Sequence, residues 1–545
     1  MTNAGKQWLL AYNLTSHAVM LTAVAVAVAA LLIQAQRSAA LEQATTAADP
    51  PPRHLGQRML KAIRHHPLVA LLFCAYSAAM VHGTTWFYPE FPDLYSTIIN
   101  SRTLDAFTLQ ERFIAETMQR NSFRFFPLAH QDLHVLSWFT PYVSVWMLVS
   151  AAELITTLLL SWRVVVGISR RDHGSLLLIS LLFLFHPATG WGFFQLVYSE
   201  RLLTVLFAAF VFFRWRVAEQ GRMSDACYAL SCALIGVFVK DIAVVLFVTP
   251  SLVALLSRRL GLTSSQRSDR LDHWLCGLIP LVLIAYVALS LIPSLVVGSS
   301  GFDNDGRFQL EADWRLLVLG LISLGRLVQI ARGRFRPQLI DGLNAAALGY
   351  AAALLVSVGY PYASFWTLPV QLVTVLNLGW LWNSWLAPKL QPIVPIHALP
   401  ALGAAACLSL IGLEHRSGDS FAKRVTTIKT SQQQWLATYT AMEQVARDHK
   451  RRGEAVNVIF MRSYFNQHTL GRLNVDRLIE YDRQQNRFTV VEGRNRGQRY
   501  RPQTGDFLLI IDKREPSDLG QDGENFREII RHGTSKRGGR IFRHR

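Results

Sequence analysis

Apolar runs of membrane-spanning length, or slightly less, recur along most of this sequence. Inside a bilayer every backbone amide must find a hydrogen-bond partner within the protein, so such runs are expected to form helices. The chain is also apolar on average, with 51% hydrophobic residues and a mean hydropathy of +0.23. Twelve runs stand out: 12–34, 66–83, 135–161, 175–187, 201–213, 226–239, 242–257, 274–298, 315–331, 341–359, 367–386 and 395–413. The sequence therefore predicts an α-helical polytopic membrane protein with about 11–13 transmembrane helices.

Changes in composition divide the chain into three parts. Residues 1–65 hold the first run and a linker, and residues 66–413 form the main transmembrane region, with a large loop at 84–134. From residue 414 the pattern becomes that of a small α/β domain. Its predicted elements are a helix over 430–450, strands at 456–460, 487–491 and 507–511, and a helix at 525–532. This domain is basic, because residues 415–545 contain 26 Lys and Arg against 15 Asp and Glu.

Basic residues concentrate in alternate short loops, for example Arg170 with Arg171 and Arg258 with Arg259. Loops rich in Lys and Arg face the cytoplasm in membrane proteins. The loop 84–134, the C-terminal domain and, for an even number of spans, the N-terminus are then expected on the opposite side. We predict a multi-pass protein of the cell's inner (plasma) membrane with its site on the periplasmic, extracytoplasmic side. No nucleic-acid partner is expected there.

Ionisable residues beside or inside membrane spans are costly, so they need a partner or a function. In the predicted topology, four groups of them converge on the extracytoplasmic face. They are Glu90 with Asp93; Arg124 with His130, Asp132 and His134; Glu200 with Arg201; and Lys240 with Asp241. Glu153 lies deeper in a span and is interpreted as a structural partner within the bundle.

Such a set suits sugar transfer from a lipid phosphate. A carboxylate can take the proton of the acceptor hydroxyl, and Arg or Lys can hold the phosphate and stabilise its charge. Other roles stay open: Lys240 and Asp241 could neutralise each other, Glu200 with Arg201 could cap a span, and Arg124 could anchor the loop at the interface. Aromatic residues from Tyr360 to Trp366 are typical of an interfacial belt.

A metal site is not predicted. His130 and His134 flank Asp132 with a helical i,i+4 spacing, but no third ligand lies nearby in the sequence. We expect no required cofactor, and a divalent metal is left as an open alternative.

Three short motifs occur in a characteristic order: Arg124-x-x-Pro127-Leu128, Tyr198-x-Glu200-Arg201 and the pair Lys240-Asp241. With the acids after the second run, this layout resembles the GT-C superfamily of integral membrane glycosyltransferases, over most of residues 66–413. The resemblance implies a transmembrane catalytic domain that uses a polyprenyl-phosphate sugar. It implies Glu90 or Asp93 as general base and Arg124, Arg201 and Lys240 as phosphate ligands. The spacing Glu-x-x-Asp departs from the adjacent or Asp-x-Asp pair of the family.

The predicted function is therefore a membrane glycosyltransferase that moves a sugar from a polyprenyl-phosphate donor to an extracytoplasmic glycan, lipid or protein. Asp132 is a further candidate catalytic or sugar-binding acid, with His130, Glu200 and Asp241 in supporting roles. One alternative is a flippase for lipid-linked sugars, which should carry ionisable residues near the bilayer midplane and often shows internal repeats. Another is a ligase or polymerase of lipid-linked glycans, whose key residues would lie in a large late loop; here the loop 299–315 is short.

Overall fold

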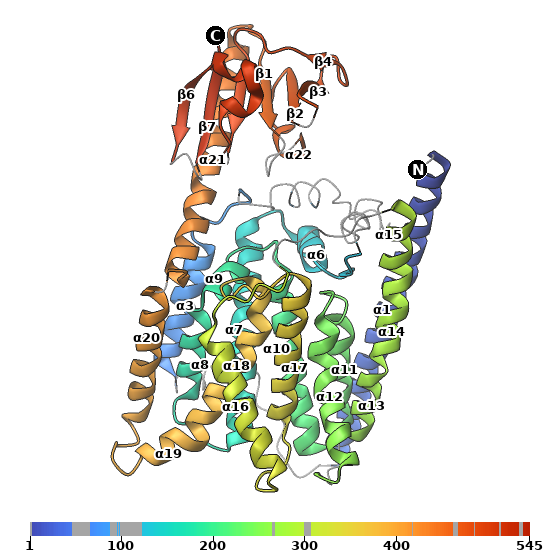
Figure 1. Cartoon of the computed structure of the whole chain (residues 1–545), viewed down its shortest axis with the longest axis vertical. Coiled ribbons are helices and arrows are strands. Elements are labelled where there is room, and N and C mark those ends of the chain that lie inside the picture. The colour runs from blue at the N-terminus through green and yellow to red at the C-terminus, as the bar shows by residue number, and fades with distance from the viewer. Residues whose placement is uncertain are drawn as a thin grey trace.

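A helical bundle carries a smaller domain with a β-sheet at one end (Figure 1). The computed structural model describes residues 3–45, 66–87, 95, 98, 123–263, 268–298, 307–416, 418–461, 467–483, 485–511, 514–533 and 538–545. The first helices are α1 (Asn3–Thr45), α3 (Pro67–Val81), α6 (Gln131–Phe139), α7 (Val143–Ser169), α8 (Ser175–Leu184), α9 (Pro187–Phe193), α10 (Glu200–Gln220), α11 (Met223–Gly236) and α12 (Ala243–Arg259). Then come α13 (Asp269–Cys276), α14 (Leu278–Tyr286), α15 (Ile292–Val297), α16 (Trp314–Ala331), α17 (Leu339–Ser357), α18 (Leu368–Leu381), α19 (Ala387–Leu390) and α20 (Leu399–Arg416).

Five of these helical segments are long and apolar enough to cross a membrane. They are Gln7–Glu42 within α1, then α7, the continuous segment Asp269–Val297 formed by α13 to α15, α16 and α17. A sixth results if α8 and α9, which meet at 73°, form one broken span. Among the described residues, five or six helices thus meet the length and composition expected of a span, fewer than the 11–13 predicted. The other apolar runs are helical too, but they are shorter, as in α3 and α11, or carry more charge, as in α10.

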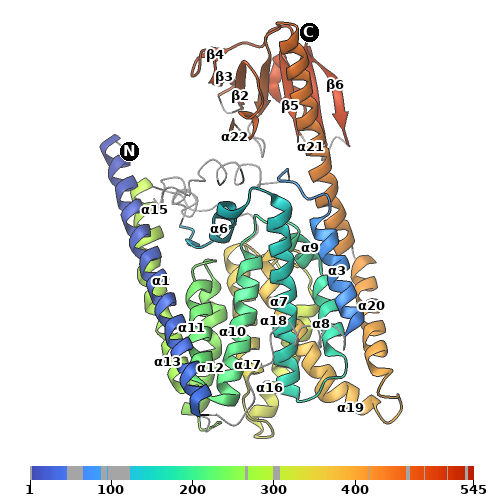
Figure 2. The ribbon, with the colours of Figure 1, turned by 180° about the vertical axis from the view of Figure 1, so that it is seen from behind.

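The two ends of the chain lie at the same end of the bundle (Figures 1 and 2). Helix α1 runs along the outside of the bundle, next to α11 and the α13–α15 segment. Most of its side chains are exposed or half-buried, because it has few neighbours on its outer face. The predicted placement of the N-terminus on the same side as the C-terminal domain agrees with this arrangement.

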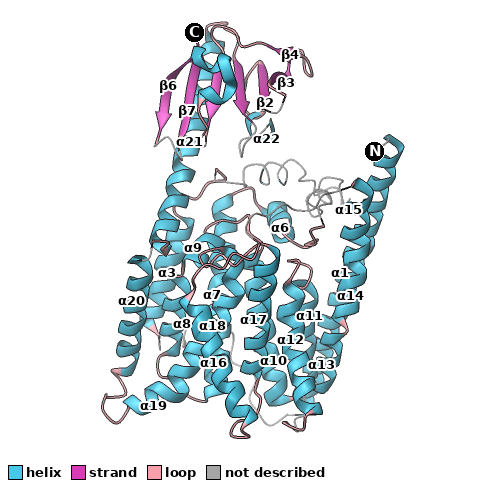
Figure 3. Ribbon diagram, in the orientation of Figure 1, coloured by secondary structure: helices cyan, strands magenta, loops and turns pink. Residues whose placement is uncertain are grey.

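The C-terminal domain is built on one long helix, α21 (Phe421–Arg451), and a seven-stranded mixed sheet (Figure 3). The strands are β1 (Asn457–Met461), β2 (Arg477–Asp482), β3 (Arg487–Gly493), β4 (Arg499–Tyr500), β5 (Phe507–Ile510), β6 (Phe526–His532) and β7 (Gly539–His544), in the order β4-β3-β2-β1-β5-β7-β6. Strand β1 is parallel to β2 and β5. The paired ladders beyond them are antiparallel.

Each face of this sheet has its own apolar layer. On one face Trp435 and Met442 of α21 pack with Val458 and Phe460. On the other, the 3-10 segment Pro516–Asn525 contributes Leu519 to a second cluster. Helix α21 therefore belongs to the sheet domain at its C-terminal end, while its N-terminal end lies in the bundle (Figure 3).

The prediction of a helix at 525–532 was wrong, because this segment is the edge strand β6. It pairs with β7 in an antiparallel ladder. Burial alternates along it, with Phe526, Glu528 and Ile530 less exposed than Arg527 and Ile529. A period of two is that of a strand.

Candidate functional site

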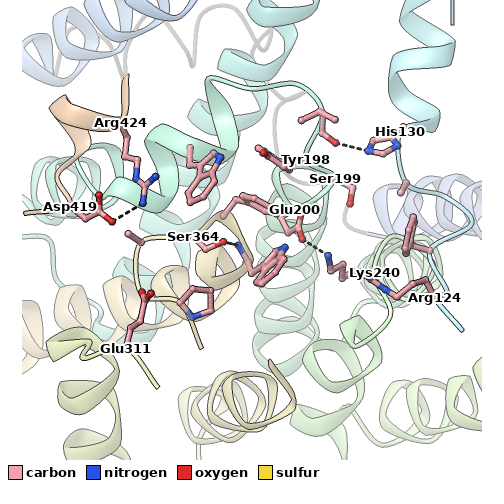
Figure 4. Close-up of a pocket in the computed structure, with 18 residues that line it drawn as sticks. Arg124, His130, Tyr198, Ser199, Glu200, Lys240, Glu311, Ser364, Asp419 and Arg424 are labelled. Atoms are coloured by element: carbon pink, nitrogen blue, oxygen red, sulfur yellow. Dashed lines mark hydrogen bonds and ion pairs between the residues drawn. The ribbon is translucent and has the colours of Figure 1, made fainter. Parts of the chain in front are cut away.

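Figure 4 shows residues that line a cavity of about 630 Å³. They belong to segments next to α6, α9 and the start of α21, which lie at the end of the bundle that faces the sheet domain (Figure 1). Six parts of the chain line it: residues 124–130 before α6, residues 191–200 from α9 to the start of α10, Lys240, Glu311, residues 361–366, and residues 419–424 at the start of α21. The first three of these parts contain residues predicted from the sequence. The structure therefore brings Arg124, His130, Glu200 and Lys240 to the wall of one cavity.

Lys240 and Asp241 lie in the break between α11 and α12, as the interrupted apolar run predicts. Helix α11 ends at Gly236, where a Cβ atom would lie 2.2 Å from the ring of Phe247 in α12. The glycine thus allows the two short helices to pack closely next to the break.

The two charges of this break do not neutralise each other. Lys240 Nζ lies 2.6 Å from Glu200 Oε1, whereas Asp241 Oδ2 accepts a 2.5 Å hydrogen bond from Arg124 Nε. Asp241 Oδ1 also accepts one from the amide of Phe125. The alternative of a Lys240–Asp241 structural pair is therefore wrong. Two cross-pairs join the break to the segment before α6 and to the first turn of α10.

Arg201 is not among the residues that line the cavity and is 1% exposed. Its guanidinium is ion-paired with Asp132 and lies 2.5 Å from Glu153 Oε2. The guanidinium of Arg201, which the sequence suggested as a phosphate ligand, is thus already paired with two carboxylates. Asp132, in the first turn of α6, is held by its ion pair with Arg201. Glu153 on α7 has the structural role within the bundle that its depth predicted.

The histidines are placed differently from each other. His130 is the residue before α6, with a left-handed φ of 64°, and its Nε2 lies 2.5 Å from the carbonyl oxygen of Val197. His134 is buried on α6. Within the part of the chain that the structure describes, no group of three or more His, Cys, Asp or Glu side chains is placed to hold a metal ion.

Aromatic rings form one wall of the cavity. Tyr198 stacks on Phe365, with ring centroids 3.6 Å apart, and Trp191 meets Phe365 edge-on. Lys240 Nζ lies 5.8 Å from the ring centre of Trp366. Phe365 and Trp366, interpreted from the sequence as part of an interfacial belt, therefore face a cavity. Tyr360 is buried and donates a hydrogen bond to Asp313.

Three charged residues of the cavity were missed by the sequence analysis. Arg424 Nη2 donates to Asp419 Oδ2 at 2.7 Å, and its guanidinium lies 4.3 Å from the ring centre of Trp191. Glu311 follows a short bridge between Leu310 and Tyr360, and its exposed carboxylate forms no ion pair with any described residue. The sequence analysis assigned Asp419 and Arg424 to the separate C-terminal domain. In the structure α21, with its N-cap Ser420, begins at the bundle, and both residues line the cavity.

Glu90 and Asp93, the predicted base candidates, lie outside the described residues. The chain just before them is anchored. Lys429 of α21 donates to the carbonyl oxygens of Met80 and His82 and to Thr84 Oγ1, at 2.7, 2.9 and 2.6 Å. Burial lowers the pKa of Lys429 to about 8. A lysine at these carbonyls satisfies the C-terminal end of α3.

The sequence matches no family model, and searches of curated proteins and of solved structures give no match. What the chain itself defines is a largely helical protein with several helices able to span a membrane and a small C-terminal sheet domain. The resemblance to membrane glycosyltransferases therefore rests on the sequence motifs at Arg124, Tyr198 and Lys240.

Proposed function

We propose that this protein is a membrane glycosyltransferase of GT-C type. It transfers a sugar from a polyprenyl-phosphate donor to an extracytoplasmic acceptor, which is a cell-envelope glycan, a lipid-linked glycan or an exported protein. The observation that carries the proposal is the meeting of Arg124 and Lys240, from distant segments, beside the aromatic wall of one cavity at the end of an apolar bundle. A lipid-linked sugar phosphate has the three matching parts: an anionic phosphate, a ring and an apolar tail.

In this proposal the phosphate lies near Arg124 and Lys240. Each of these cations already has a carboxylate partner, which holds it in position and lowers the net charge of the site. Negative charge grows on the phosphate as its bond to the anomeric carbon breaks, and both cations stabilise that charge. The ring of the sugar packs on the aromatic wall, because aromatic faces suit the apolar faces of pyranose and furanose rings.

The acceptor hydroxyl must lose its proton as its oxygen bonds to the anomeric carbon. Glu90 or Asp93 remains the base that the family resemblance implies. Glu311 is a further carboxylate at the cavity, and it forms no ion pair with the residues that the structure describes. Glu200 and Asp419 are less suited, because each is ion-paired.

The test is transfer of radiolabelled sugar from a panel of synthetic polyprenyl-phosphate sugars by the full chain in proteoliposomes, with and without chelator. One donor should be turned over, and the chelator should have no effect. Lys240→Met should lower the rate about 100-fold or more, the scale of losing one charge-stabilising group. The matched control Lys389→Met, on α19, should retain the wild-type rate. Equal rates in the two variants would exclude the role given to Lys240.

The base is identified by two further variants in the same assay. Glu90→Ala with Asp93→Ala should abolish transfer if the base is in the loop 84–134. Loss in Glu311→Gln, with activity kept in the double variant, would instead assign the base to Glu311.

A further inference from the structure

A second cavity, of about 420 Å³ and lined by three arginines, lies at the opposite end of the bundle from the candidate site. Helix α12 starts at Ala243, next to Lys240, and ends at Arg259. Arg258, in its last turn, lines this second cavity, together with Arg170 at the end of α7 and Arg214 in the last third of α10. The cavity is thus formed where α7, α10 and α12 end and α17 begins.

The arginines of this cavity differ in how fully they are paired, and Arg214 is held by Ser251 Oγ at 3.0 Å and by the carbonyl oxygen of Pro250 at 3.2 Å. Arg214 and Arg258 share one fully buried carboxylate, Asp272, at 2.6 and 2.7 Å. Asp269, which is half-exposed, lies 3.1 Å from Arg258 Nη2 and 3.6 Å from His273 Nδ1. Glu219 also lines the cavity. Arg170 is exposed and forms no ion pair with a described residue.

Two buried donors at this cavity have no acceptor. Arg214 is 4% exposed, and its Nε makes no hydrogen bond within the described part of the chain. The same holds for the indole Nε1 of Trp215, which also lines the cavity. A buried N–H without an acceptor is costly.

An apolar groove of about 510 Å³ continues from this cavity. The two share Val253, Ser257 and Pro337. The groove runs between α12 and α16, and its leucines are largely exposed: Leu256 56%, Leu260 63%, Leu324 58% and Leu327 62%. Because α16 is one of the candidate spans, these leucines face the lipid side of the bundle.

We propose that the cavity and the groove together bind one anionic glycerophospholipid of the bilayer. Its phosphate accepts hydrogen bonds from the exposed Arg170, with Arg214 and Arg258 adding positive charge, and an acyl chain lies in the groove. Free phosphate has no acyl chain to fill the groove. A zwitterionic lipid carries an ammonium group that the arginines repel. The site does not depend on the proposed enzymatic function. Such a lipid ties the ends of four helices together.

The test is native mass spectrometry of the full chain in detergent with equal amounts of phosphatidylglycerol and phosphatidylcholine. The wild type should bind phosphatidylglycerol about tenfold more tightly, the scale of one charge-assisted hydrogen bond. Arg170→Gln should bring this preference close to parity. Leu324→Trp, which fills the groove, should weaken the binding of both lipids. The control Arg334→Gln changes an exposed arginine outside the cavity and should keep the preference.

Several outcomes would overturn the proposal. One is the absence of headgroup preference in the wild type, and another is an equal loss of preference in Arg334→Gln and Arg170→Gln. Displacement of phosphatidylglycerol by inorganic phosphate at matched concentration would assign the cavity to the free anion. Stronger binding of polyprenyl monophosphate than of phosphatidylglycerol would assign it to the polyprenyl lipid.

Discussion

The guanidinium of Arg201 is buried between two carboxylates, Asp132 and Glu153, in the wall between α6, α7 and α10. A buried charge that loses its partner is left without solvation, so removing one member of such a group is strongly destabilising. Arg201→Gln should therefore lower stability by about 3–5 kcal/mol. Thermal unfolding of the detergent-solubilised chain measures this. Arg163→Gln, an exposed change on α7, should have almost no effect, and equal melting temperatures for the two variants would contradict the account.

Lys429 provides a pH-dependent prediction, because burial lowers its pKa from 10.5 to about 8. Between these values the unfolded chain holds a proton that the folded chain has released. Stability from this residue therefore rises with pH through that window. Lys429→Met should lack this rise when melting temperatures are compared between about pH 7 and pH 10. The exposed control Lys423→Met should follow the wild-type pH response, and a wild-type response in Lys429→Met would refute the prediction.

At this scale the sequence could indicate which residues matter, because charges beside apolar runs are few and costly. It could not give their partners. Lys240 and Asp241 are adjacent in sequence, and each pairs instead with a residue 40 or more positions away. Such pairing depends on how loops and helix ends meet, which no local pattern encodes. Arg424 was missed for the same reason.

Among the elements, the break between α11 and α12 depends on close packing at Gly236. A Cβ there would collide with the ring of Phe247. Gly236→Ala should push the two helices apart, shift Lys240 and lower transfer by about tenfold or more. Gly325→Ala, in α16, is the matched control because nothing lies within 4 Å of its added Cβ. It should be neutral or stabilise by about 0.5–1 kcal/mol. Normal activity in Gly236→Ala would contradict this role of the break.

Several elements could be predicted from local patterns. The predicted strands 456–460, 487–491 and 507–511 became β1, β3 and β5 to within one or two residues. The apolar runs 315–331 and 341–359 became α16 and α17 almost to the residue. The segment 525–532 became β6, since a free edge of the sheet was available to it and its alternating burial suits pairing with β7. Its mixed charges and short length carried no local signal that favoured a strand.

Across the whole molecule, α21 connects the two domains. Its first turns contribute Arg424 to the cavity, Lys429 holds the end of α3, and Trp435 with Met442 packs under the sheet. The division of the chain at residue 414 was suggested by composition, which does not reveal that the connecting helix belongs to both parts.

The arrangement of the termini can be tested independently of function. Tags placed at the two ends should be accessible from the same side of sealed vesicles, since both ends lie at the same end of the bundle. Protease protection of each tag measures this. Opposite protection of the two tags would contradict the arrangement.

The most direct test of the central claim follows a labelled polyprenyl-phosphate sugar in proteoliposomes and measures two quantities together. One is sugar transferred to acceptor or water, and the other is lipid that appears in the opposite leaflet. The account predicts transfer without translocation, with transfer lost in Lys240→Met. Translocation of intact donor without any transfer would contradict it and assign the cavity to a flippase.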